Sequence, residues 1–443
     1  VKGLAVPAYS HRYVVDGSIA GVHANIAVPG DATANWRSVV VAAGGDGAQN
    51  VFAINTTSTT YNVNSVMWEI NSSTLSGTTQ QAFGSVVGRP IIGKLSDGTT
   101  STWVAIFGNG YNSTSDTAKL FVVRLDTGAV IRVLDTNNLI TTNGLGSTVA
   151  VRSTTTGLTD TIQYVYGADY QGNVWRFDLS GASSSWATGA WVFKTATAQP
   201  ITAELLVADS PTGAPAGKMI YFGTGKYLGS NDASDTSVQA LYGIFDDLSN
   251  TSSALASISG TSALASMTIT PTAGVTDRRQ VSTVAAGTEW WKTPGKKGWV
   301  VPLTGTGIAV GERVIAAPVR YTQSGTSMDA LLFTSIVPLA GDCVAGLDTW
   351  ITAISPATGG AVAAFKGITE DSVKIVGGSP RGVFVLSDTS KPTLYISQTV
   401  FAGTPPTSTF TTDAGGDRKT SIGGVGGETR ILVVELDPWT PPD

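Results

Sequence analysis

The segment TWVAIFGNGYNSTSDTAKLFVVRLDTG, residues 102–128, contains two apolar runs joined by a glycine-rich turn. The first run is Trp103–Val104–Ala105–Ile106–Phe107, and the second is Leu120–Phe121–Val122–Val123. Short runs rich in β-branched and aromatic residues, bounded by Gly, Asn and Ser, are typical of β-strands. The segment therefore predicts a β-hairpin.

The same hairpin pattern recurs along the chain. Its turns are marked by Gly47, Gly110, Gly172, Gly225, Gly341 and Gly403, which are 63, 62, 53, 116 and 62 residues apart. The interval of 116 residues leaves room for one more unit, the weakest, in the stretch Val281–Leu303. Repeated antiparallel units of this length are typical of propeller blades, because one four-stranded blade cannot bury both of its faces alone. We therefore predict an all-β fold, a seven-bladed, quinoprotein-like β-propeller with long loop insertions. Two β-sandwiches made of unrelated hairpins are the alternative.

Composition supports a folded β-rich protein and excludes several classes. Charged residues make up 13% of the 443 residues, and 52 are glycine. The net charge of −5 makes nucleic acid an unlikely partner, although Arg278–Arg279 and the lysines near residue 295 form a local basic run. One cysteine and two histidines exclude a disulfide framework and a His-rich metal cluster. The longest apolar runs are too short for a transmembrane segment.

We expect residues 1–443 to form a single propeller domain with an irregular insertion at about 250–290. Because the chain begins with Val1, the N-terminal part of the parent protein is expected to be missing. Three turns have Asp or Ser followed closely by Gly: Leu125–Gly128, Phe177–Gly181 and Ser355–Gly359. Asp side chains and Gly backbones favour tight turns, so a structural role is expected for these residues.

Three longer segments resemble a known family when they are taken together. They are Phe107–Ser113, Tyr166–Leu179 and Tyr221–Leu228, the last followed by Leu241–Ile244. In this order and spacing they resemble the C-terminal propeller domain of the PilY/PilC-type type IV pilus tip-associated adhesins. The resemblance covers most of residues 13 to 360.

The resemblance implies a non-enzymatic, exported protein at the pilus tip, outside the cell. Members of the family support pilus extension against retraction, and they bind surfaces. The implied partners are minor pilins and a host or abiotic surface ligand that the sequence does not identify.

The family also implies a calcium loop just before the Tyr166 segment, with the pattern Asp-x-Asn/Asp-x-Asp-Gly-x-x-Asp. In this chain the same window begins with Arg152, has Thr154 and Thr156 at the middle positions, and ends with Asp160. Calcium needs several oxygen ligands, mostly carboxylates, and this window supplies one carboxylate beside a cation. We expect the loop to keep its shape without strong metal binding, so no cofactor is predicted.

Two other groups of residues are candidates for binding. Asn231, Asp232 and Asp235 lie in a Ser-rich hairpin tip, where a solvated loop is favoured over a weak calcium site. A second group could stack on sugars or bases but is expected to cover a blade edge; it consists of Trp290, Trp291, Lys292, Lys296 and Lys297. Cys343 is expected to be buried or to pair with a cysteine elsewhere in the parent protein.

Two other functions remain open from the residues. One is an extracellular module that captures glycans or DNA. The other is a quinone-dependent oxidoreductase, because the run from Val122 to Gly128 is similar to repeats of those propellers. The chain lacks the vicinal cysteine pair that many of those enzymes use, and it has no Gly-x-Ser-x-Gly motif for serine hydrolysis.

Overall fold

The structure is a computed structural model in which the placed residues fall into two compact units. It describes residues 15–156, 158, 160–196, 199–254, 261–322, 329–338, 347–362, 364, 369–375, 379–386, 393–400, 420–422 and 428–435. The first unit comprises Val1–Val192 and Asn250–Leu255, and the second comprises Phe193–Ser249 and Ala256–Asp443. Each unit is described by itself. Whether the chain forms the single domain that we expect stays a prediction.

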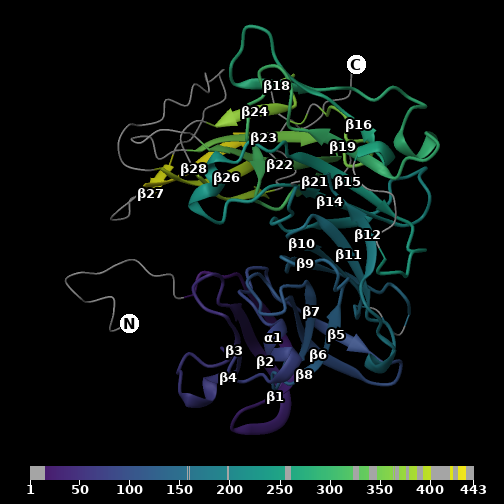
Figure 1. Cartoon of the computed structure of the whole chain (residues 1–443). Helices are drawn as coiled ribbons and strands as arrows, with labels where there is room; N and C mark the ends of the chain where they lie inside the picture. The colour runs from purple at the N-terminus through teal and green to yellow at the C-terminus, as the bar shows by residue number, and fades with distance from the viewer. Residues whose placement is uncertain are drawn as a thin grey trace. The chain divides into compact units, whose positions relative to one another are not determined.

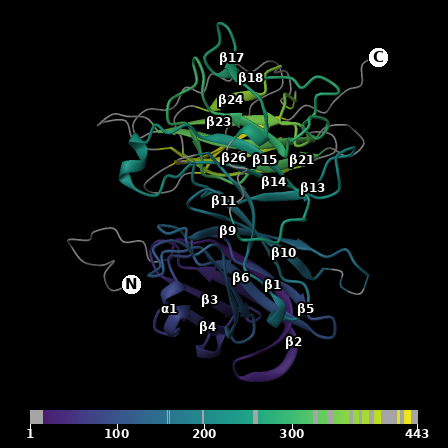
Figure 2. The same ribbon diagram turned by 45° about the vertical axis from the view of Figure 1, so that its right-hand side comes forward.

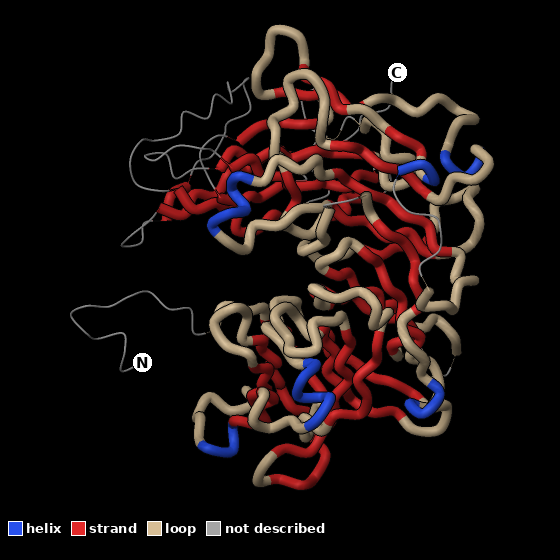
Figure 3. Tube along the Cα trace, viewed as in Figure 1, coloured by secondary structure: helices blue, strands red, loops and turns tan. Residues whose placement is uncertain are grey.

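Strands dominate both units, as the red segments of Figure 3 show. The described residues form six sheets, and sequential antiparallel neighbours make up the body of each. The first unit is built on three four-stranded sheets. These are β1 (Ile19–Val28), β2 (Asp31–Ala43), β3 (Asn50–Asn55) and β4 (Val66–Asn71); β5 (Ile91–Ser96), β6 (Ser101–Gly108), β7 (Lys119–Arg124) and β8 (Val130–Asp135); and β9 (Leu145–Arg152), β10 (Ile162–Asp169), β11 (Asn173–Asp178) and β12 (Ala190–Lys194).

The second unit also contains three sheets, two of which carry additional strands (Figures 1 and 2). The fourth sheet has the order β13 (Leu206–Asp209), β14 (Lys218–Gly223), β15 (Ala240–Asp246), β19 (Gly298–Pro302) and β16 (Ala265–Ser266). The fifth has the order β17 (Ile269–Pro271), β18 (Arg278–Val281), β24 (Ser372–Ile375), β23 (Leu347–Ile354), β22 (Asp329–Pro338) and β20 (Arg313–Val314), with β21 (Val319–Thr322) also paired to β22. The sixth has the order β25 (Ser379–Leu386), β26 (Thr393–Val400), β28 (Glu428–Glu435) and β27 (Thr420–Ile422).

Strand β6 shows why the central strands are continuously apolar. Val104 and Ile106 belong to the core between the second and third sheets. Ala105 and Phe107 belong to a different core, between the first and second sheets. Because successive side chains of a strand point to opposite faces, each run supplies two sheet-to-sheet interfaces. This face-to-face packing is what the propeller prediction requires of a central strand.

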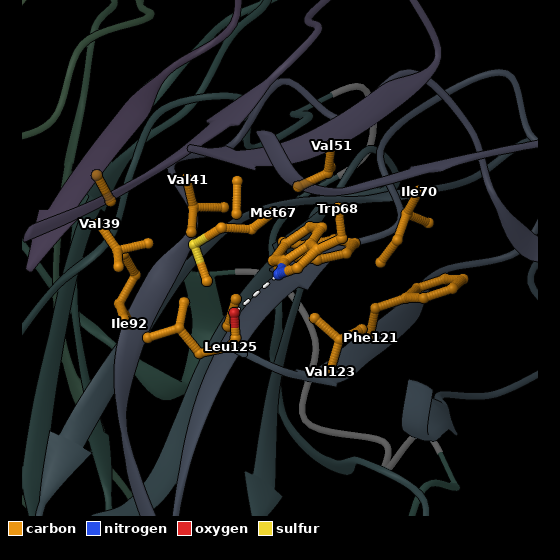
Figure 4. Packing of buried hydrophobic residues seen from close by; sticks show 14 of the residues in the cluster. Val39, Val41, Val51, Met67, Trp68, Ile70, Ile92, Phe121, Val123 and Leu125 are labelled. Atoms are coloured by element: carbon orange, nitrogen blue, oxygen red, sulfur yellow. Dashed lines mark hydrogen bonds between the residues drawn. The ribbon is translucent and has the colours of Figure 1, made fainter. Parts of the chain in front are cut away.

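A buried tryptophan connects neighbouring sheets in each unit. In the first unit the Trp68 indole nitrogen donates to the backbone oxygen of Leu125 at 2.7 Å, as the dashed line in Figure 4 shows. Gly128 lies under the ring with a φ of +70°, and a Cβ at this position would come within 2.7 Å of the indole. We call this arrangement of indole, carbonyl and glycine a tryptophan latch.

The second unit repeats the tryptophan latch. The Trp299 indole nitrogen donates to Pro356 oxygen at 3.1 Å, and a Cβ on Gly359 would come within 2.5 Å of the ring. The structural role expected for the turns Leu125–Gly128 and Ser355–Gly359 is therefore confirmed: they receive a tryptophan from the adjacent sheet.

The repeat predicted from the turn glycines is present, but its weakest unit was assigned wrongly. Each marker glycine lies between the second and third strands of a sheet's main hairpin series, although Gly341 and Gly403 themselves lie outside the described residues. Val281–Leu303 is not a separate blade, because β19 pairs with β15 in the fourth sheet and β18 pairs with β24 in the fifth. The interval of 116 residues is filled by strands that extend these two sheets. A count of seven blades is not confirmed.

Helices are few and short. The α-helix α1 (Gly77–Ala82) lies between β4 and β5, and the remaining helical segments are single 3₁₀ turns. Within the part of the chain that the structure describes, no helix is both long and apolar enough to span a membrane.

Candidate functional site

The turns between second and third strands contain buried polar residues that connect adjacent sheets. Asn109, which follows β6, is fully buried and uses its whole amide. Its nitrogen donates to Ala82 and Thr117 oxygens, both at 2.9 Å, and its oxygen accepts from Lys119 and Leu145 amides at 2.9 and 3.0 Å. Leu145 begins β9 of the next sheet, so Asn109 fixes the junction between two sheets.

Asp169, at the end of β10, occupies the corresponding place in the third sheet. It is fully buried and accepts hydrogen bonds from Asn143 (2.9 Å), Asn173 (2.9 Å) and the Trp175 indole (2.8 Å). Burial raises the pKa of the Asp169 carboxyl, and these hydrogen bonds oppose that rise only in part. Nearby, burial also raises the pKa of the Tyr111 phenol. A raised pKa can mark a catalytic acid, but the oxygens of Asp169 are occupied by structural donors.

A second buried carboxyl lies in the fifth sheet. Asp371 accepts the backbone N–H groups of Val281 at 2.9 Å and Val362 at 2.8 Å, and burial raises its pKa to about 6. It connects β18 to the segment after β23. Asp371 therefore holds a strand of the insertion against the main sheet.

The basic run at Arg278–Arg279 is also part of the core. Arg279 is 2% exposed, its Nη1 lies 2.8 Å from Glu312 Oε2, and its guanidinium is 3.4 Å from the centre of the Trp350 ring. Ser335 donates to the other Glu312 oxygen at 2.6 Å. Arg279 is thus already paired and covered, and it presents no charge to an external phosphate.

The window expected to resemble a calcium loop joins β9 to β10, and an arginine lies within it. Arg152 Nη1 donates to the backbone oxygen of Asp160 at 2.8 Å and lies 3.6 Å from the Asp160 carboxylate. Arg152 Nη2 donates to Ile92 oxygen, on β5 of the second sheet, at 3.2 Å. Thr154 and Thr156 are exposed. With one carboxylate facing a guanidinium, these residues do not fit Ca²⁺.

The hairpin tip with Asn231, Asp232 and Asp235 follows β14, and it too encloses an arginine. The guanidinium of Arg313, which is 1% exposed, donates to the backbone oxygens of Lys226 (3.1 Å), Asp232 and Asp235 (2.6 Å). Asn231 contributes its backbone oxygen to the Ser234 hydroxyl at 2.9 Å. The sequence analysis missed Arg313, because nothing in local spacing connects it with a loop about 80 residues earlier.

The aromatic and basic candidates at residues 290–297 are engaged with the protein itself. Trp290 is 2% exposed and donates its indole N–H to Ala357 oxygen at 2.9 Å, and Trp291 packs edge-on against it. Lys292 pairs with Glu289 at 3.1 Å. This region covers the fourth sheet.

The two remaining lysines also have partners. Lys296 donates to Ser262 and Leu264 oxygens at 2.8 and 2.9 Å, and Lys297 pairs with Asp247 at 2.8 Å. The hydrogen bond from Lys297 is the main reason that the pKa of Asp247 is lowered. Binding of a ligand by this group stays a prediction.

No other cluster of metal-ligating residues emerges in the described part of the chain. Groups of three or more His, Cys, Asp or Glu side chains that could hold a metal ion are absent there. Cys343 lies outside the described residues, so its expected burial or pairing stays a prediction.

Stacked antiparallel sheets joined by tryptophan latches define a β-propeller protein, and comparison with known proteins gives the family. Residues 2–269, more than half of the chain, match the family model of the PilY1 beta-propeller domain. The chain belongs to this family. The family resemblance seen in the sequence is thereby confirmed.

Relatives with assigned names agree with this family. The chain is 34% identical over 385 residues to a type IV pilus biogenesis factor PilY1 homolog of Xylella fastidiosa, covering 81% of this chain and 24% of that protein. It is 29% identical over 387 residues to type IV pilus biogenesis factor PilY1 of Pseudomonas aeruginosa, covering 79% of this chain and 31% of that protein. The chain thus spans about a quarter to a third of these relatives.

A solved structure supports the fold. The crystal structure of the P. aeruginosa PilY1 C-terminal domain superposes with a TM-score of 0.67 at 22% identity. The superposition covers 96% of this chain and 84% of that domain.

Proposed function

We propose that this chain is the propeller module of a type IV pilus biogenesis factor, and that it supports pilus assembly by binding other proteins. The family match over residues 2–269 carries this proposal. The names of the relatives from Xylella fastidiosa and Pseudomonas aeruginosa point the same way.

The proposed role is non-enzymatic. The buried titratable groups that could serve as catalysts, Asp169 and Asp371, accept hydrogen bonds from backbone and side-chain donors that hold strands together. A catalytic carboxyl has to reach a substrate within hydrogen-bond distance. Neither a quinone-dependent oxidation nor a hydrolysis is favoured by this arrangement.

The proposed partners are minor pilins, and the proposed location is the pilus tip, outside the cell. A rigid stack of sheets suits such a role because binding residues are commonly placed on loops that a stable scaffold positions. Adhesion to a host or abiotic surface is part of the proposal. Capture of glycans or DNA is less favoured, because Trp290 and Arg279 are buried and paired.

Deletion of the encoding gene, followed by complementation, tests the proposal. The deletion strain should lose surface pili, and a tagged copy of the full-length protein should co-purify with minor pilins. Complementation with Trp299→Ala, which removes a tryptophan latch, should fail. Lys292→Ala changes a surface pair and should restore piliation. Normal piliation in the deletion strain, with no pilins recovered, would contradict the proposal.

A further inference from the structure

Two hairpin loops of this chain gather the oxygen donors that calcium sites use, and each contains a guanidinium. One is the loop at residues 152–160 in the first unit, and the other is the loop at residues 226–235 in the second unit. We call them the Arg152 loop and the Arg313 loop. Their arginines reach them differently, because Arg152 is part of its own loop and Arg313 comes from a distant segment.

The Arg313 guanidinium is surrounded by backbone oxygens. Nη1 donates to Lys226 and Asp232, Nη2 donates to Asp235, and Nε donates to Gly311 oxygen at 2.8 Å. Converging carbonyl oxygens from a tight loop are also how proteins coordinate calcium, at 2.3–2.6 Å. Here the centre of the loop is occupied by a cation that is covalently part of the chain.

The carboxylates of the Arg313 loop are used for other contacts. One Asp232 oxygen accepts the amides of Leu228 and Gly229 at 2.8 and 3.0 Å, and the other pairs with Lys226 at 3.2 Å. Asp235 accepts the Ser237 amide at 2.9 Å. These contacts lower the pKa of both carboxyls, although burial opposes them and is the largest single influence at Asp232.

The Arg152 loop shows the same substitution in a more exposed setting. Arg152 stands at the first position of the window, where the family pattern has a carboxylate, and its guanidinium contacts both the backbone oxygen and the carboxylate of Asp160. Its contact with Ile92 ties the loop to the adjacent sheet. A divalent cation at this place would face a fixed positive charge at short range.

We infer that Arg152 and Arg313 take the place of bound metal in these two loops, so that both loops keep their conformation without calcium. A guanidinium satisfies up to five acceptors in a fixed planar geometry, which suits several carbonyl oxygens at once. Surface residues carried by the Arg313 loop, such as Tyr227 and Leu228, are then presented in the same way at any calcium concentration. These two side chains are 40% and 53% exposed.

Terbium luminescence tests the inference without any assay of function. Tb³⁺ occupies calcium sites and is sensitised by nearby aromatic rings. The 443-residue chain should show no saturable Tb³⁺ signal, and its melting temperature should be the same in EDTA and in millimolar calcium. Saturable binding that is removed by Asp160→Asn or Asp232→Asn would overturn the inference.

A graft in the Arg152 loop gives a matched positive control. The triple variant Arg152→Asp, Thr154→Asp, Thr156→Asp places carboxylates at the family's ligand positions, with Asp160 already present. This variant should bind Tb³⁺ and melt at a higher temperature in calcium than in EDTA, whereas the natural sequence should do neither.

Limited proteolysis tests the Arg313 loop directly. Arg313→Ala should speed cleavage within residues 226–238 several-fold, and added calcium should not restore protection. If Arg313→Ala does not fold, Arg313→Lys keeps the charge but loses the planar donor geometry, and it should give a smaller increase in the same cleavage. Unchanged cleavage in the folded variant, or full rescue of the variant by calcium, would contradict the inference.

Discussion

The two units share one device and differ in another. Both contain a tryptophan latch, with an indole N–H donated to a carbonyl 57 residues later in each unit. Both also contain a loop with an arginine, but Arg313 is 1% exposed, whereas the Arg152 side chain is 41% exposed. The latches therefore have similar surroundings, while the arginine loops lie in different dielectric environments.

This difference shows how burial determines what a charged side chain contributes. Arg313 gives its hydrogen bonds where water cannot replace them, so removing it leaves several backbone oxygens without donors. Arg152 and Asp160 lie where water competes for every contact, and Asp160 is 81% exposed. Similar chemistry should thus stabilise the second unit far more than the first.

The largest effect is expected from Arg313→Ala. Loss of the guanidinium leaves buried carbonyl oxygens without partners, and the free energy of unfolding of the second unit should fall by about 3–5 kcal/mol. Urea denaturation, followed by tryptophan fluorescence, measures this. Because the two units can unfold separately, the transitions should be analysed individually. A loss below about 1 kcal/mol would remove the contrast between the loops.

The tryptophan latches should give matched, intermediate effects. Trp68→Phe and Trp299→Phe each remove an indole hydrogen bond and part of a buried ring, so each should cost about 2 kcal/mol. Differential scanning calorimetry of the two variants makes the comparison. If one variant is neutral and the other is strongly destabilised, the latches are not equivalent.

Asp371 should give a smaller effect that depends on pH. Its folded pKa of about 6 lies above the model value of 3.8. The stability linked to this group is therefore complete below pH 3.8 and is lost as the pH rises through 6. Between pH 7 and pH 5 the melting temperature should rise, and Asp371→Asn should reduce that rise. Asp169, whose pKa is also raised, acts in the same direction. A slope that Asp371→Asn leaves unchanged would exclude this assignment.

The smallest effect is expected from Arg152→Ala. An exposed ion pair and two hydrogen bonds to backbone oxygens should contribute no more than about 1 kcal/mol. Urea denaturation of this variant beside Arg313→Ala gives the ratio of the two effects directly. Equal losses for the two variants would mean that burial does not set the contribution of these arginines.

The sequence predicts the repeated hairpins well because strand and turn signals are local. Runs such as Val104–Phe107 alternate between two cores, and the marker glycines occur between the strands of a hairpin. The same local signals mislead at Val281–Leu303, where β19 resembles any other strand but completes the fourth sheet. Strand pattern alone does not say which sheet a strand joins.

Long-range partners explain what the sequence analysis missed at the candidate sites. The lost carboxylates at Arg152 and Thr154 are visible in the window itself. The contacts of Arg313 with Lys226 and Asp235 are not, because they depend on tertiary packing. The latches do leave a signal: Trp68 precedes Gly128 by the same number of residues as Trp299 precedes Gly359. That spacing equals one unit of the hairpin repeat.

A crystal structure of this chain grown in millimolar calcium, with anomalous scattering data collected to locate the ion, tests the central claim most directly. The guanidinium of Arg313 should lie among the oxygens of Lys226, Asp232 and Asp235, and Arg152 should contact Asp160, with no anomalous peak in either loop. A calcium ion within either loop, with its arginine displaced toward solvent, would contradict the claim.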